Sequence, residues 1–146
     1  MKHKTLTTIL LTTILILLGQ SCRVRSINGE LDAQWQITSI VYADGTQAEL
    51  LPNGLYVSFY RHTIQFYTPP AVWENRPTGN MVYDENTQMI AVEMPYWAPE
   101  FHNWGLDIPA DGQAKPYTTT LQVLSLSDKY LTLRTPEGTV ISLRKY

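Results

Sequence analysis

Residues 93–107 hold the densest group of side chains that could do chemistry in this 146-residue chain. Glu100 and His102 could form a general acid–base pair, or could bind a metal ion together with Asp107. No His-x-x-x-His pair, glycine-rich phosphate loop or Gly-x-Ser-x-Gly elbow occurs in the chain to support either use. We therefore predict no catalytic residue, no bound metal and no cofactor, and we expect that the protein is not an enzyme.

Aromatic side chains dominate the same stretch and indicate binding instead. They bring large apolar area at small entropic cost, and two nearby prolines restrict the backbone. We predict that four aromatics line the lid or mouth of a cavity for a small apolar or amphipathic ligand: Tyr96, Trp97, Phe101 and Trp104. Two alternatives stay open. The segment plugs one end of the fold, or it is exposed and contacts a protein or glycan partner.

The first 22 residues have the features of an export signal. Lys2 and Lys4 precede an uncharged apolar run over residues 6–18, and the single cysteine of the chain follows at Cys22. As a helix, this run reaches only about 20 Å, less than the ~30 Å hydrocarbon core of a bilayer, so we expect no permanent span. The sequence at 19–22, Gly-Gln-Ser-Cys, resembles the lipobox of bacterial lipoproteins, in which the cysteine becomes the lipidated first residue.

This resemblance divides the chain into three parts. Residues 1–21 are a signal peptide that is removed, residues 22–29 are a lipidated tether, and residues 30–146 are the folded domain. It implies that the partner is a membrane, reached through the lipid on Cys22. We expect the protein in the cell envelope, at the outer membrane, and its membrane face stays open.

Net charge and size exclude one class of partner and a second domain. Removing Lys2 and Lys4 with the signal peptide changes the net charge from −2 to −4. Nucleic-acid binding needs clustered basic residues that displace counterions, so no nucleic-acid partner is expected. The remaining length suffices for one hydrophobic core.

Apolar residues alternate with a period of two over most of the chain, which indicates strands. The phase breaks after Thr38, at residues 39–41, and this break predicts a bulge or a bend. The predicted strands span residues 34–38, 55–60, 62–68, 80–83, 88–94, 117–125, 130–134 and 139–144. We predict an all-β fold, a small up-and-down antiparallel barrel of about eight strands in which the first and last strands pair. A two-sheet sandwich is the alternative.

Several segments resemble the small lipocalin-like lipoproteins of gut Bacteroidetes. They are residues 31–40 with Asp44-Gly45, 78–84, 103–105 and 140–146, and the likeness extends over most of residues 30–146. In lipocalins a Trp of the first strand closes the barrel bottom and an Arg of the last strand lies over it. The resemblance assigns these structural roles to Trp35 and Arg144, although Ala33 replaces the usual Gly.

A second aromatic group alternates with the apolar residues of two neighbouring strands. Tyr56, Tyr60 and Tyr67 lie on the face opposite Val57 and Phe66. Tyrosines inside the barrel would give an amphipathic lumen, whereas tyrosines outside would be surface residues. Periodicity leaves both possibilities open.

Overall fold

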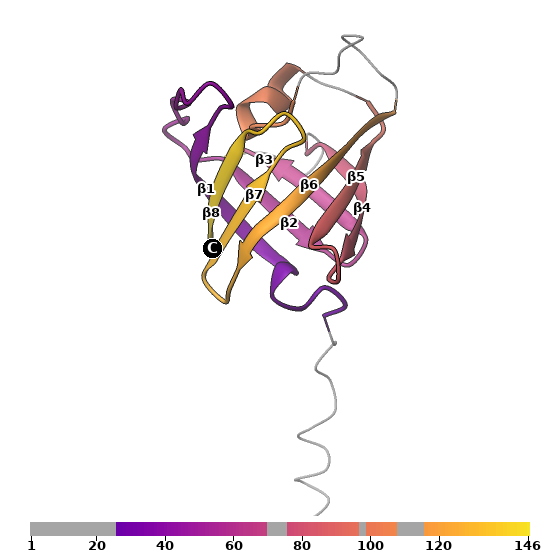
Figure 1. The fold of residues 1–146 in the computed structure, drawn as a ribbon. Helices are drawn as coiled ribbons and strands as arrows, with labels where there is room; N and C mark the ends of the chain where they lie inside the picture. The colour runs from indigo at the N-terminus through magenta and orange to yellow at the C-terminus, as the bar shows by residue number, and fades with distance from the viewer. Residues whose placement is uncertain (1–25, 70–75, 97–98, 108–115) are drawn as a thin grey trace, which may run out of the picture.

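The computed structural model describes residues 26–69, 76–96, 99–107 and 116–146, which form one closed sheet of eight antiparallel strands (Figure 1). This confirms the predicted all-β, lipocalin-like barrel over the sandwich. The strands are β1 (Ala33–Val41), β2 (Tyr56–Tyr60), β3 (Thr63–Tyr67), β4 (Thr78–Asp84), β5 (Met89–Met94), β6 (Tyr117–Leu126), β7 (Tyr130–Arg134) and β8 (Val140–Lys145). Two short 3-10 helices accompany them, η1 (Gly29–Leu31) and η3 (Pro99–Trp104).

Each strand pairs with the next one in the sequence, and β1 pairs with β8 to close the barrel. Gln36 lies opposite Arg144, and Ile40 lies opposite Ile141. The register shifts between Ile37 and Ser39, so the bulge predicted from the phase break is confirmed. Closure gives each of the eight described strands a neighbour on both sides, although β6 pairs with β7 only from Gln122 onward.

The two ends of the barrel differ in their connections (Figure 1). Short turns join β2 to β3, β4 to β5 and β6 to β7 at the end where η1 lies. The connections from β1 to β2, β3 to β4 and β5 to β6 are longer and leave their strands at the opposite end, where η3 lies. We call these the η1 end and the η3 end.

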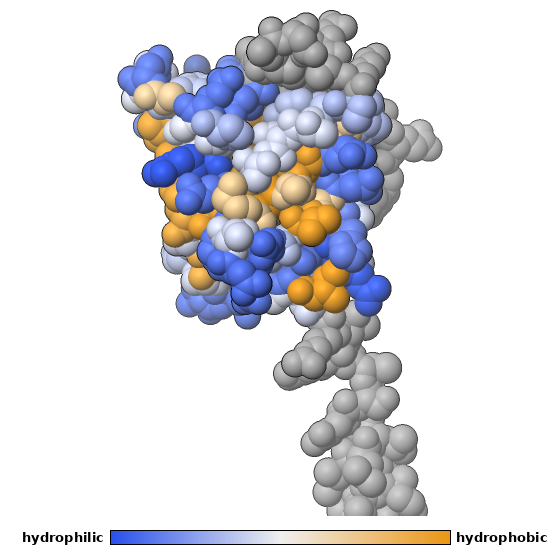
Figure 2. All heavy atoms as spheres, turned by 45° about the vertical axis from the view of Figure 1, so that its right-hand side comes forward, coloured by the Kyte–Doolittle hydropathy of each residue, from blue (hydrophilic) through white to orange (hydrophobic). Residues whose placement is uncertain are grey.

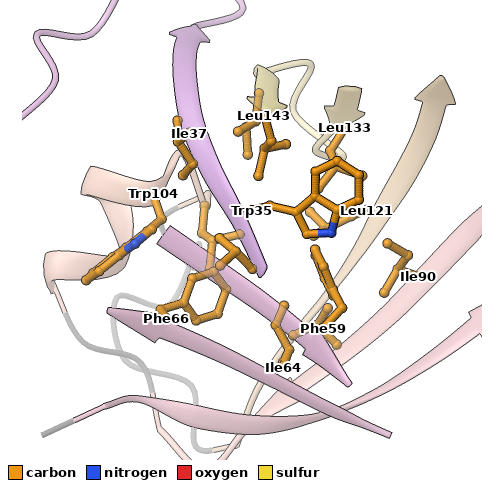
Figure 3. Close-up of a cluster of buried hydrophobic side chains, with 14 of the residues drawn as sticks. Trp35, Ile37, Phe59, Ile64, Phe66, Ile90, Trp104, Leu121, Leu133 and Leu143 are labelled. Atoms are coloured by element: carbon orange, nitrogen blue, oxygen red, sulfur yellow. The ribbon is translucent and has the colours of Figure 1, made fainter. Parts of the chain in front are cut away.

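Inward-facing side chains fill the barrel. Trp35, Ile64 and Ile90 have no exposed surface, and Phe59 is only 1% exposed. Figure 3 shows them pointing at one another from different strands. A void large enough for a water molecule would leave exposed area on its walls, so the lumen around these side chains is closely packed.

The η1 end is closed by Trp35. Its indole Nε1 donates to the Leu31 carbonyl oxygen at 3.0 Å, which fixes η1 across the opening. The structure corrects the predicted partner of this ring: the Lys145 Nζ lies 5.4 Å from the ring centroid, while Arg144 donates to the Gln36 Oε1 at 2.8 Å on the outer face. Side chains alternate along β8, so Lys145 shares the inward face with Leu143, and Arg144 cannot share it.

Asp32 holds η1 to the turn between β2 and β3. Its carboxylate accepts hydrogen bonds from the Ser26 Oγ at 2.8 Å, the Asn28 Nδ2 at 2.6 Å and the Arg61 backbone N–H at 2.9 Å. Burial alone would raise the pKa of Asp32, but these hydrogen bonds outweigh burial and lower it. The chain is therefore attached to the barrel from Ser26 onward.

The strand tyrosines lie on the outer face, which decides between the two possibilities left open by the sequence. Tyr56 and Tyr67 are paired neighbours whose rings stack at 5.1 Å, and the Arg76 guanidinium lies 4.3 Å from the Tyr67 centroid. The edge of Tyr146 packs on Tyr56 at 5.0 Å. Tyr60 is 58% exposed. These tyrosines therefore lie outside the lumen, but only Tyr60 is a surface residue, because Tyr56 and Tyr67 are each 7% exposed.

Candidate functional site

Two aromatic side chains of η3 enter the barrel at the η3 end. Phe101 is fully buried and Trp104 is 6% exposed. Their ring centroids each lie 5.7 Å from that of Phe66 on β3, and Phe101 is 6.3 Å from Tyr117 on β6. Figure 3 shows Trp104 on η3 and Phe66 on the barrel wall lying on the same side of the core. We call Phe66, Phe101, Trp104 and Tyr117 the η3 cluster.

Gly105 ends η3 and turns the chain into the core. Its φ of +78° lies in the left-handed region that favours glycine. A β-carbon at this position would lie 3.0 Å from Ile141 and 3.2 Å from Ile40, so the backbone here packs directly on β8 and β1. The next residue, Leu106, is 1% exposed. The turn thus places buried side chains on both sides of one glycine.

Asp107 fastens the segment after η3 to the turn between β7 and β8. Its carboxylate accepts from the Thr135 Oγ1 at 2.8 Å and from the Glu137 backbone N–H at 3.3 Å. The Tyr117 hydroxyl donates to the Asp107 carbonyl oxygen at 3.3 Å. Burial, together with the nearby carboxylates, raises the pKa of Tyr117 to about 12.

Within the described ranges, the Trp104 indole N–H is buried without a hydrogen-bond partner. Its ring contacts are with Phe66 and Phe101, whose side chains offer no oxygen acceptor. The other fully described tryptophan at a barrel end, Trp35, has its N–H satisfied by Leu31. A buried donor left without an acceptor costs about 1–3 kcal/mol. An acceptor atom placed beside the Trp104 indole would therefore stabilise the η3 cluster.

The four predicted ligand-binding aromatics therefore separate. Phe101 and Trp104 plug the η3 end, which was one of the arrangements left open by the sequence. Tyr96 is 43% exposed at the rim and its ring stacks 6.3 Å from Phe101. Trp97 lies outside the described residues. Because Phe101 and Trp104 are buried, neither side chain is available to a protein or glycan partner in this conformation.

The residues considered for catalysis do not come together. The His102 ring is exposed and stacks on Tyr42 at 5.2 Å, while Asp107 is engaged with Thr135. The side chain of Glu100 lies outside the described part of the structure. Among the residues that are described, no three His, Cys, Asp or Glu side chains are grouped so that they could hold a metal ion.

The structure also reveals a feature that sequence reasoning missed, a hollow of about 550 Å³ on the outside of β4, β5 and β6. Asn80, Val82 and Glu93 contribute to its wall, and a second hollow of about 250 Å³ continues it past Asn80 and Glu93. These residues come from strands that are distant in the sequence. The sequence alternation showed that these side chains lie on one face of each strand. It did not show the strand register that brings the three strands' residues together.

No helix in the described ranges is long and apolar enough to cross a bilayer. The predicted signal peptide and Cys22 lie outside these ranges, so their roles stay predictions.

A closed eight-stranded up-and-down barrel with a Trp at one end defines the calycin-like class of folds. The family model of the lipocalin-like domain matches residues 15–146, and the chain belongs to this family. A crystal structure of a lipocalin-like protein from Bacteroides uniformis ATCC 8492 is similar over 81% of this chain and 100% of that one, with 21% identity and a TM-score of 0.53. This level of identity supports the fold alone.

A second crystal structure, of an uncharacterized protein from Bacteroides eggerthii DSM 20697, is similar over 78% of this chain and 98% of that one. Its identity is 20% and its TM-score is 0.48. The search of curated proteins gives no match.

Proposed function

We propose that this chain is a non-enzymatic binding protein of the cell envelope, anchored by a lipid on Cys22, which takes a small amphipathic molecule at the η3 end. The unpartnered N–H of Trp104 carries this proposal. An apolar molecule with one oxygen acceptor would fit the η3 cluster in two ways. Its oxygen accepts from the indole, and its apolar body packs against Phe66 and Phe101.

Binding requires the η3 plug to move, because the described lumen is full. Displacing a large buried side chain costs about 1.5–3 kcal/mol in lost burial, so the ligand must replace apolar area of similar size. The expected ligand therefore has an apolar body comparable to one or two aromatic rings.

The proposed anchor sets the orientation of this site. Cys22 is four residues before Ser26, and four residues span at most about 14 Å when fully extended. Ser26 is bonded to Asp32 beside η1, whereas η3 lies at the opposite end of the barrel (Figure 1). A lipid on Cys22 would hold the η1 end near the membrane, and a ligand would reach the η3 end from the aqueous side.

Ligand carriage is tested by native mass spectrometry of the protein purified from its own host. We expect the wild type to retain a small adduct, and Trp104→Phe to lose it because the indole donor is gone. The matched control is Tyr60→Phe, an exposed aromatic far from η3, which should keep the adduct. A wild type that carries no adduct, or an adduct retained equally by Trp104→Phe, contradicts the proposal.

The anchor is tested separately by growing the host with an alkyne fatty acid. The wild type should acquire the label and fractionate with membranes, and Cys22→Ala should lose both properties. Label that persists on Cys22→Ala would refute lipidation at this residue.

A further inference from the structure

We propose that the outer wall of β4, β5 and β6 binds a neutral oligosaccharide. This site is separate from the η3 cluster and independent of the ligand proposed there. We define the wall groove by six outward-facing residues on the three strands: Asn80, Val82, Ala91, Glu93, Thr118 and Thr120.

Strand register turns these residues into two parallel rows. Asn80 lies opposite Glu93, which lies opposite Thr118, and Thr63 on β3 extends this polar row. Because neighbouring strands are about 4.8 Å apart, a row across four strands is about 14 Å long. The second row, Val82, Ala91 and Thr120, runs beside it. The groove thus has one polar side and one mainly apolar side along the same direction.

The polar row is free to bind. Within the described part of the chain, neither the Asn80 amide nor the Glu93 carboxylate has a hydrogen-bond or ion-pair partner, and both side chains are exposed. The carboxylate can accept from two neighbouring hydroxyl groups, and the amide can donate to one and accept from another. Adjacent hydroxyls on a sugar ring offer this combination of donors and acceptors.

The second row suits the carbon–hydrogen face of a sugar ring. Val82 is 61% exposed, Ala91 is also exposed, and Pro136 borders the hollow. Figure 2, which turns this side of the barrel toward the viewer, shows an apolar patch surrounded by hydrophilic surface. A ligand with one apolar face and a ring of hydroxyls covers both rows together.

Charge and topology argue against other occupants. Among the residues that the structure describes, no Lys, Arg or His lines either hollow, and the carboxylate of Glu93 repels anionic ligands such as phosphates or acidic glycans. An extended peptide cannot add as a strand to β5 in the middle of the groove, because residues 89–93 of β5 are paired with β4 on one side and with β6 on the other. A neutral glycan needs neither a positive charge nor a free strand edge.

The test is a titration of the whole mature protein with neutral hexasaccharides of glucose, xylose and mannose, followed by calorimetry and by ¹⁵N–¹H NMR. We expect at least one hexasaccharide to bind and to shift amide signals of β4, β5 and β6. Glu93→Ala should weaken binding by about tenfold or more, because a hydrogen bond to a charged group is lost. Ala91→Arg should block the groove and abolish binding.

Glu85→Ala is the matched control, because it removes an exposed carboxylate from the turn after β4 and should leave binding unchanged. All three substitutions are on exposed positions, so their circular dichroism spectra should match the wild type. Three outcomes would overturn the proposal: no hexasaccharide binds, binding survives both groove substitutions, or the shifted signals are confined to η3. Binding of oligolysine in place of the sugars would assign the groove to a cationic peptide and would equally refute it.

Discussion

The two end tryptophans allow one substitution to be compared in two environments. Trp35 and Trp104 are both buried, but only the Trp35 indole has an acceptor, the Leu31 carbonyl at 3.0 Å. Replacing each by phenylalanine removes the same atoms and one N–H donor. The two variants therefore differ chiefly in whether the lost N–H had an acceptor, with the Lys145 contact over the Trp35 ring as a second, smaller difference.

The expected sizes follow from this contrast. Both substitutions lose packing and leave a small cavity, which costs about 1–2 kcal/mol. Trp35→Phe also leaves the Leu31 carbonyl without its donor, which adds about 1–3 kcal/mol. Trp104→Phe instead removes an unsatisfied donor and regains about 1–3 kcal/mol. We expect Trp35→Phe to destabilise by about 2–5 kcal/mol, and Trp104→Phe to lie between about 1 kcal/mol less stable and about 2 kcal/mol more stable than the wild type.

Equilibrium urea unfolding followed by far-ultraviolet circular dichroism measures both values, and an unchanged m-value establishes that the unfolded states are comparable. The melting temperature of a domain of this size falls by about 3–5 °C per kcal/mol, so the variants should differ clearly by calorimetry as well. If Trp104→Phe loses as much stability as Trp35→Phe, the Trp104 indole is satisfied in solution. The proposed ligand site would then lose its support.

Three further predictions concern the walls and ends of the barrel. Gly79→Ala should destabilise by about 1–3 kcal/mol, since its β-carbon would collide with the Met94 sulfur, whereas Asn80→Ala next to it should be nearly neutral by urea unfolding. The pKa of Asp32 is lowered in the fold, so the stabilisation that its carboxylate contributes is present above about pH 4 and is lost as the pH falls further. Asp32→Asn should therefore be less stable than the wild type at pH 7. This difference in the free energy of unfolding should shrink when unfolding is measured at lower pH. The pKa of Tyr117 is raised to about 12, so the stabilisation contributed by its neutral hydroxyl is complete below about pH 10 and is lost above it. Between pH 8 and pH 11, Tyr117→Phe should therefore lose less stability than the wild type. An equal loss in the two proteins would contradict this prediction.

Local alternation predicted much of the fold. In β2, Val57 and Phe59 face inward and Tyr56 faces outward, as a period of two requires. The same rule on β8 places Leu143 and Lys145 on one face. The resemblance to lipocalins pointed instead to Arg144, and the strand's own alternation overrules it. The phase of a strand is thus readable from its residues even where a family pattern suggests otherwise.

Features that depend on register could not be read from the sequence. Asn80, Glu93 and Thr118 form one row because β4, β5 and β6 pair in one particular alignment, and each single strand admits several alignments. The burial of Phe101 and Trp104 depends on a turn at Gly105 against β1 and β8, which are distant in the chain. The sequence located these aromatics but left open the direction in which they point.

The two ends of the barrel differ in how far their buried polar groups are hydrogen-bonded. At the η1 end the Trp35 donor is satisfied by Leu31, the Asp32 carboxylate is satisfied by Asn28 and by the Arg61 backbone, and Lys145 bridges to Glu30 at 2.9 Å. At the η3 end a tryptophan of similar burial has no acceptor within the described residues, and the longer connections leave the strands at this end. Segments that function in binding belong to the less stable parts of a fold, because they must open without unfolding the rest. An unsatisfied donor inside a packed cluster lowers the cost of opening at that end, while the fully bonded η1 end holds the barrel closed.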